Sequence, residues 1–192
     1  MALSKSIVDS RVRKQIPKLA LAQTKKIIKS AFERKKTEMI AEFLNHPVTI
    51  EIKGGINAGN ISGILNGITN LYSFIGFYES SDPIAPILDA LQTTNLKYTS
   101  TSSRSINFTV ELPKPEEIWK VTPLPYNVGR SWAKSIETGL SGLNYYLKKR
   151  QSSRSGLGIQ SKKKVRAARF KNTRYISAFL KRYKKEFENL KV

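Results

Sequence analysis

Few side chains in this 192-residue chain could do chemistry, and they do not gather in the sequence. His46 is the one histidine and there is no cysteine, so a Ser–His pair has one option and a thiolate nucleophile or zinc ligand has none. Metalloprotease, nucleotide-binding and serine-hydrolase motifs are absent. The adjacent Glu116 and Glu117 cannot share a helix face, and Asp82 and Asp89 have no further acid beside them. The sequence predicts no catalytic residue, metal site or cofactor, and we expect a protein that is not an enzyme.

Attraction of polyanions is the chemistry that the sequence does indicate. The net charge is +20, from 34 Lys and Arg against 14 Asp and Glu, and no acid occurs between Glu137 and Glu186. A dense run of like charge repels itself unless a polyanion or counter-ions neutralise it, and each cation that meets a phosphate releases bound counter-ions. We assign contact with nucleic acid or an acidic partner to the densest part of this run. Its residues are Lys162, Lys163, Lys164, Arg166, Arg169 and Lys171.

Two other interpretations of the basic run stay open. A solvated loop without a partner is one, although the 15 Lys and Arg from Lys148 to Lys185 exceed what solubility requires. An acidic protein surface is the other possible partner. No zinc-finger, basic-zipper or RNA-recognition signature is present, so contact with a nucleic-acid backbone is favoured over base reading.

The charge is concentrated at the two ends of the chain. Residues 1–46 carry a net +7 and residues 121–192 a net +15, whereas residues 47–120 carry −2. A nearly neutral middle between two basic segments predicts one body with basic extensions. The predicted organisation is an N-terminal arm (1–17), an α+β body (18–147) with a long loop (54–70), a basic loop (148–172) and a C-terminal helix (173–192).

The first half of the body is predicted to form a helix and two strands. Apolar residues at helical spacing predict a long helix over 18–45, begun near Pro17 and ended at His46-Pro47, where His46 is expected to cap or pack. Strict alternation of apolar and polar residues predicts a half-buried strand over 48–53. The aromatic-rich segment 71–77 is the second strand candidate.

The second half of the body is predicted to form a hairpin among helices. Asp82 is the expected N-cap of a short helix, and 96–112 is expected to form a hairpin. Residues 113–121, with Trp119, are expected to form a short helix or a turn before an extended Pro123–Pro125 connection. A helix follows from Trp132 to Leu147, and Thr173 is expected to cap the last helix. The fold class is therefore α+β, a small antiparallel sheet packed with a long N-terminal helix and C-terminal helices, with extended loops.

Residues 54–78 carry no charge and need a membrane test. Six glycines and four asparagines in this stretch make it too polar for a lipid-facing helix, so we expect an adaptable loop and no membrane partner. The N-terminus has no apolar run followed by a small-residue cleavage site, so no secretory signal is expected.

Several segments resemble the virion neck proteins of long-tailed bacteriophages. They span roughly positions 40 to 160 and lie at 46–52, 70–77, 123–147 and 153–160. The resemblance implies a head–tail connector or tail-completion protein of the phage neck. Such proteins form a homo-oligomeric ring around the DNA channel, between the portal side of the head and the tail.

The resemblance also sets expectations about partners and location. Neighbouring neck, portal or tail proteins would bind the ring, DNA would pass nearby, and the protein would be found in the virion after assembly in the host cytoplasm. No catalytic residue is transferred. The alternative is a basic nucleic-acid-binding module of the ribosomal or nucleoid type, and a nuclease subunit is a third class.

Overall fold

A computed structural model describes residues 5–65, 69–101, 106–138 and 173–190. Within these ranges the chain forms helices and two small two-stranded antiparallel sheets. The expected α+β class, with one long N-terminal helix, is confirmed.

The long helix is longer than the sequence pattern predicted. α1 spans Lys5–Asn45 as one helix of 41 residues, so it neither begins at Pro17 nor leaves a separate short helix before it. A proline inside a helix costs about 3 kcal/mol, and the good helix formers on both sides offset this cost. The predicted end before His46-Pro47 is confirmed.

The segment predicted as the first strand is a helix, and that prediction is wrong. α2 spans Pro47–Lys53 and begins with His46 as N-cap and a proline at its first position. Its buried residues are Val48, Thr49, Glu51 and Ile52, whereas Ile50 is exposed. This spacing is helical, and packing has overridden the strand preference of the β-branched residues.

The second predicted strand is also a helix. α3 spans Leu71–Ile75, followed by Gly76, whose φ of 81° lies in the left-handed region that ends helices. Asn70 is its N-cap, and the Asn70 Oδ1 accepts the amide hydrogen of Ser73 at 2.8 Å. These two end signals outweigh the aromatic residues between them.

The next elements lie close to their predicted positions, although the N-cap of the short helix is Ile84 and not the predicted Asp82. α4 spans Ala85–Gln92, and the Asp82 carboxylate accepts the amide hydrogens of Ile84 and Ala85 just before it. β1 (Asn95–Thr101) and β2 (Ile106–Glu111) form the expected antiparallel hairpin. α5 spans Pro115–Lys120, as expected for the segment with Trp119.

A second hairpin was not predicted. The extended connection at Pro123 is β3 (Pro123–Leu124), which pairs with β4 (Asn127–Ser131). α6 (Trp132–Thr138) follows at once. The rest of the helix predicted up to Leu147 lies outside the described residues, as does the predicted basic loop.

The last helix, α8, spans Ile176–Glu188. Its N-cap is Tyr175, so the prediction that Thr173 caps this helix is wrong. The Glu137 carboxylate on α6 accepts the amide hydrogen of Ser177 at 2.6 Å and so satisfies one of the free amides of that turn. The sequence predicts an apolar stripe on this helix, and five of its six members are buried, whereas Leu190 lies beyond the end of α8 and is partly buried. The buried members are Ile176, Phe179, Leu180, Tyr183 and Phe187.

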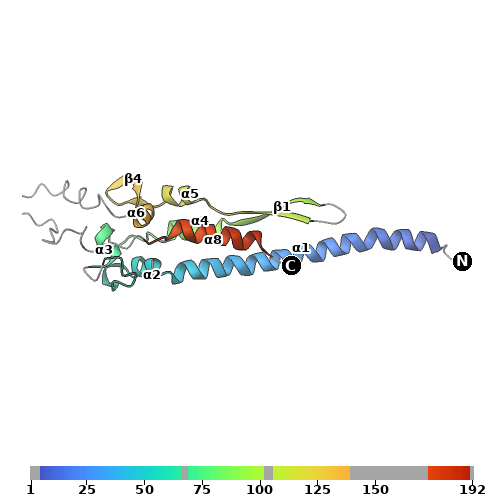
Figure 1. Ribbon diagram of the computed structural model, residues 1–192, viewed down its shortest axis with the longest axis horizontal. Helices are drawn as coiled ribbons and strands as arrows, with labels where there is room; N and C mark the ends of the chain where they lie inside the picture. Colours follow the sequence, from blue (N-terminus) through green and yellow to red (C-terminus); the bar gives the residue numbers. More distant parts are fainter. Residues whose placement is uncertain (1–4, 66–68, 102–105, 139–172, 191–192) are drawn as a thin grey trace, which may run out of the picture.

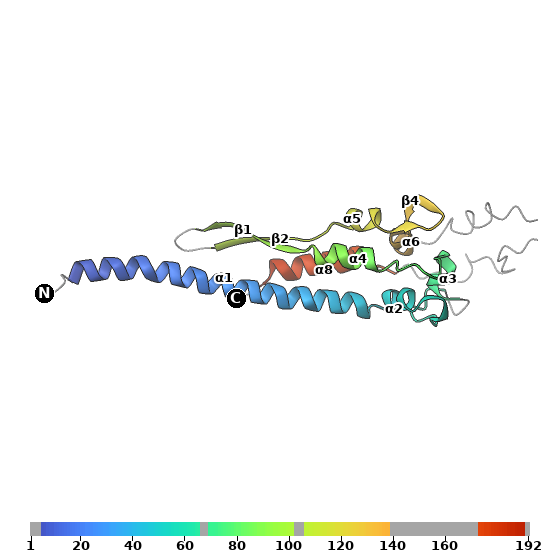
Figure 2. The ribbon, with the colours of Figure 1, turned by 180° about the vertical axis from the view of Figure 1, so that it is seen from behind.

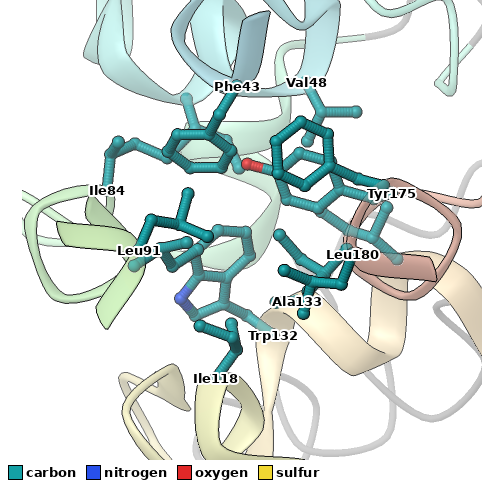
Figure 3. Close-up of a cluster of buried hydrophobic side chains, with 14 of the residues drawn as sticks. Phe43, Val48, Ile84, Leu91, Ile118, Trp132, Ala133, Tyr175 and Leu180 are labelled. Atoms are coloured by element: carbon teal, nitrogen blue, oxygen red, sulfur yellow. The ribbon is translucent and has the colours of Figure 1, made fainter. Parts of the chain in front are cut away.

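One hydrophobic core joins the two ends of the chain. Figure 3 shows the side chains of Phe43 from α1, Trp132 from α6 and Tyr175 before α8 converging between the helices. The Trp132 ring lies edge-on to Phe77 at 5.7 Å, and the Tyr175 hydroxyl shares a 2.7 Å hydrogen bond with Thr49. α8 is therefore an integral part of the body.

The elements lie along one direction in an elongated molecule (Figures 1 and 2). The hairpin β1–β2 extends beside α1 toward the N-terminus, and Lys25 of α1 places its Nζ 3.8 Å from the centre of the Tyr98 ring. α2, α3 and β4 lie together at the opposite end. Two chemically different surfaces follow from this arrangement.

Candidate interaction surfaces

The six basic residues assigned from the sequence, Lys162 to Lys171, lie outside the described residues. Their predicted role stays a prediction. The structure does describe the helix that follows them in the chain, α8, and the surface that this helix presents.

α8 is bound to α1 by a group of charged side chains. The Glu42 carboxylate on α1 accepts hydrogen bonds from Arg182 and from the Tyr183 hydroxyl. Glu186 on α8 accepts a salt bridge from Lys35 at 3.3 Å, and Lys35 also binds Glu38 at 2.8 Å. Every acid on the facing sides of α1 and α8 thus has a cation.

The pKa values of this group reflect the pairing. The hydrogen bond from Arg182 holds the pKa of Glu42 below its ordinary value, and the same bond raises the pKa of Arg182. Burial raises the pKa of Tyr183, and its bond to Glu42 adds to the effect. Glu42 is therefore charged at neutral pH and its charge is already matched.

The outer side of α8 has cations without such matching. Lys181, Lys184 and Lys185 are exposed, and within the described residues their ammonium groups have no hydrogen bond or ion pair. Spacings of three and four residues bring the three side chains to one region of the helix surface. We call these three lysines the α8 cationic face.

Exposed apolar side chains, in contrast to the lysines of α8, lie at the end of the molecule that contains α2, α3 and β4. Ile56, Ile61 and Tyr78 belong to the uncharged segment 54–78 and are 49%, 52% and 60% exposed, and Val128 of β4 is 86% exposed. We call these four residues the apolar end. Exposed large apolar side chains at one end of a molecule can serve a protein–protein contact.

Buried polar side chains hold the apolar end in shape. Glu51 is fully buried, and its two carboxylate oxygens accept the amide hydrogens of Ser62 and Leu71, both at 2.7 Å. Asn70 donates to the carbonyls of Ile56 and Ala58 at 2.7 and 2.8 Å. These hydrogen bonds therefore hold parts of the segment that was predicted as an adaptable loop against α2 and α3.

His46 caps the start of α2, whereas the sequence predicted that it would cap or pack at the end of the long helix. Its Nδ1 accepts the amide hydrogen of Val48 at 3.2 Å, and its ring lies 4.9 Å from that of Tyr175. Burial lowers the pKa of His46 below 6.5; nearby Glu42 opposes this effect and Arg182 adds to it. The cap needs an unprotonated Nδ1, so the neutral ring belongs to the folded state.

This geometry predicts a pH dependence of stability. The folded protein binds the His46 proton less readily than the unfolded chain does, so the free energy of unfolding should be highest above pH 6.5 and should fall as the pH drops below it. His46→Asn keeps a capping side chain without the titration. Urea unfolding at pH 8 and pH 5.5 should show a smaller fall for His46→Asn than for the wild type. Equal falls would mean that other groups cause the pH dependence.

The acids considered for catalysis lie apart and serve the fold. Glu51 binds backbone amides, Asp82 lies at the start of α4, and Glu111 pairs with Lys97 across the hairpin at 2.7 Å. Among the described residues, no three His, Asp or Glu side chains are grouped so that they could hold a metal ion. In the same ranges, none of the helices combines the length and apolar character needed to cross a bilayer.

The sequence analysis identified neither the α8 cationic face nor the apolar end as a complete surface. The lysines of α8 could be recognised only as lying off the apolar stripe, and their three- and four-residue spacing was the available signal. The apolar end also includes Val128 of β4, and the approach of the Tyr126 ring to Gly76 joins this part of the chain to the end of α3. No sequence spacing indicates it.

Comparison with known proteins adds no relative. No family model, no curated protein and no solved structure matches the chain.

Proposed function

We propose that this chain is a structural virion protein of the bacteriophage neck. Copies of it form a ring that joins the portal side of the head to the tail around the DNA channel. Its partners are further copies of the chain and neighbouring neck, portal or tail proteins, and its location is the virion. This proposal rests on the sequence resemblance together with the separation of apolar and cationic surfaces on the subunit.

The observation that carries the proposal is the apolar end. A chain of net charge +20 repels its own copies, so self-association needs a surface without charge. Residues 54–78 provide it, and their exposed Ile56, Ile61 and Tyr78 supply apolar contact area. A second copy of this chain is therefore the partner that we assign to the apolar end.

Native mass spectrometry in concentrated ammonium acetate tests the ring. We expect a closed oligomer of identical subunits that persists without DNA, because apolar burial is not weakened by salt. A monomer in both the presence and absence of DNA would contradict the proposal.

A matched pair of substitutions tests which surface holds the ring together. Ile61→Lys places a charge on the apolar end and should reduce the oligomer to monomer, because an unpaired charge at a buried contact costs several kcal/mol. Ile27→Lys makes the same change on α1, at a residue that is 55% exposed against 52% for Ile61, and should leave the oligomer intact. If Ile27→Lys loses the oligomer and Ile61→Lys keeps it, the contact between subunits involves α1 and not the apolar end.

The second candidate function is a basic nucleic-acid-binding module. The unmatched lysines of α8 favour it. Such a module would be a monomer that gains mass only with DNA or RNA, and salt would remove that ligand steeply. The same mass spectra therefore separate the two candidates.

A further inference from the structure

We propose that the α8 cationic face, Lys181, Lys184 and Lys185, binds the phosphate backbone of double-stranded nucleic acid. The inference deepens the proposed function, since it names the part of the subunit that faces the DNA, and it rests on that function for the source of the duplex. It concerns described residues alone and is separate from the basic segment before α8.

The first argument is the local charge balance. Two of the acids near α8 are already engaged, because Glu42 binds Arg182 and Glu186 binds Lys35 and Arg182. The exposed Glu188 follows Lys184 by four residues and Lys185 by three, so it offsets one of the three charges of the face. The face keeps a net positive field toward solvent, where a polyanion gains most from it.

The second argument distinguishes phosphate from a protein partner. The core of a protein interface is poor in lysine and rich in aromatic and large apolar side chains. The large apolar side chains of α8 are in the buried stripe, and every exposed one in the described ranges lies elsewhere, such as Ile61, Tyr98 and Val128. Lysine is a flexible point charge with no fork for bidentate bonding to carboxylates, which suits backbone contact without sequence reading.

The third argument is that the face is held rigidly. Phe187 packs against Phe32 with ring centres 5.6 Å apart, and Tyr183 lies between Phe179 and Phe187 in the buried stripe. The backbone of α8 is thereby fixed along α1 (Figures 1 and 2). One helical turn advances about 5.4 Å, which is a separation that lysine side chains can match to successive phosphates, about 3.4 Å apart along the axis of each strand.

The test compares two triple substitutions with equal loss of charge. Lys181→Gln/Lys184→Gln/Lys185→Gln removes the face. Lys29→Gln/Lys53→Gln/Lys120→Gln removes three exposed lysines from α1, α2 and α5. Binding of a labelled 24-base-pair DNA duplex to the full chain is measured by fluorescence anisotropy over a series of salt concentrations, after circular dichroism has shown that both variants melt like the wild type.

We expect the face variant to reduce the slope of log affinity against log salt by roughly 2 to 3, because each lost phosphate contact removes about 0.9. The control should change the slope by less than about 1. Equal reductions in the two variants, or no reduction in the first, would overturn the inference, since net charge or another segment would then account for binding.

Three further arms identify the ligand and separate the proposals. A duplex RNA probe should bind with a similar slope if phosphate is what the face recognises, and poly-glutamate of equal charge should displace the DNA poorly. Displacement by poly-glutamate that is as strong as by DNA, and lost in the same variant, would overturn nucleic acid in favour of an acidic protein.

Native mass spectra of the face variant should still contain the oligomer. If the oligomer forms but the face variant has the same salt slope as the wild type, this inference alone is wrong. If the salt slope of the face variant falls but no oligomer forms, the proposed function alone is wrong.

Discussion

Replacing Glu51 by leucine is expected to destabilise the protein by roughly 4 kcal/mol, because one buried and one partly buried amide would lose charge-assisted bonds worth about 1.5–3 kcal/mol each. These amides belong to Ser62 and Leu71, which anchor the uncharged segment 54–78 to α2. The free energy of unfolding is measured by urea titration followed by circular dichroism. The same variant should also lose the oligomer, since the apolar end would no longer keep its shape.

Glu51→Gln is the control that isolates the bonding. A glutamine keeps the volume and one acceptor oxygen, so the expected cost is about half of that for leucine. If the leucine variant is as stable as the wild type, the carboxylate contributes nothing to the fold and the described geometry of the loop is wrong.

The second large effect is expected at the centre of the core. Trp132→Ala should cost about 3–5 kcal/mol, as is typical when a buried tryptophan is truncated. Trp132 is 1% exposed and contacts Phe77 and Tyr175. A lower midpoint of urea unfolding with an unchanged slope would indicate lost packing without a change in the unfolded state.

The chain has one other tryptophan, which provides a matched comparison. Trp119 is partly buried, and Lys134 lies 4.8 Å from the centre of its ring. Trp119→Ala should therefore destabilise clearly less than Trp132→Ala. Comparable losses would show that α5 contributes as much to the core as α6 does.

Segments with one dominant signal were predictable from the sequence. α8 has an unbroken apolar stripe from Ile176 to Phe187, and the β1–β2 hairpin has two strand-forming runs around a serine-rich turn. Periodicity and turn chemistry agree in both segments. The α+β class could be predicted because these segments and α1 dominate the chain.

The segments predicted wrongly are those where two local signals conflict. Alternation over 48–53 favoured a strand, yet His46-Pro47 starts a helix and the buried Glu51 needs the amides of a distant loop. Leu71–Phe77 is rich in aromatics, but Asn70 and Gly76 supply the ends of a short helix. In the first case contacts distant in sequence helped to decide the outcome, and in the second the local end signals did.

For the two candidate surfaces, the sequence could predict the residue composition but not which side chains form each surface. The sequence indicates a basic C-terminal region and an uncharged segment, but pairing decides which charges stay unmatched. Arg182 and Lys35 are neutralised across the α1–α8 contact, whereas Lys181 and Lys185 are not. This distinction depends on helix orientation, which no local pattern contains.

The packing of α8 against α1 also sets the order of events during synthesis. Arg182 and Glu42 are 140 residues apart in the chain. At about 5–20 residues per second, a ribosome needs roughly 7–28 s to add that separation. Until then α1 has been translated without the helix that covers Phe32 and Phe43. Contacts of such long range slow folding, so this core cannot close before α8 has been translated, and the shorter nascent chain leaves Phe32 and Phe43 without their aromatic partners on α8.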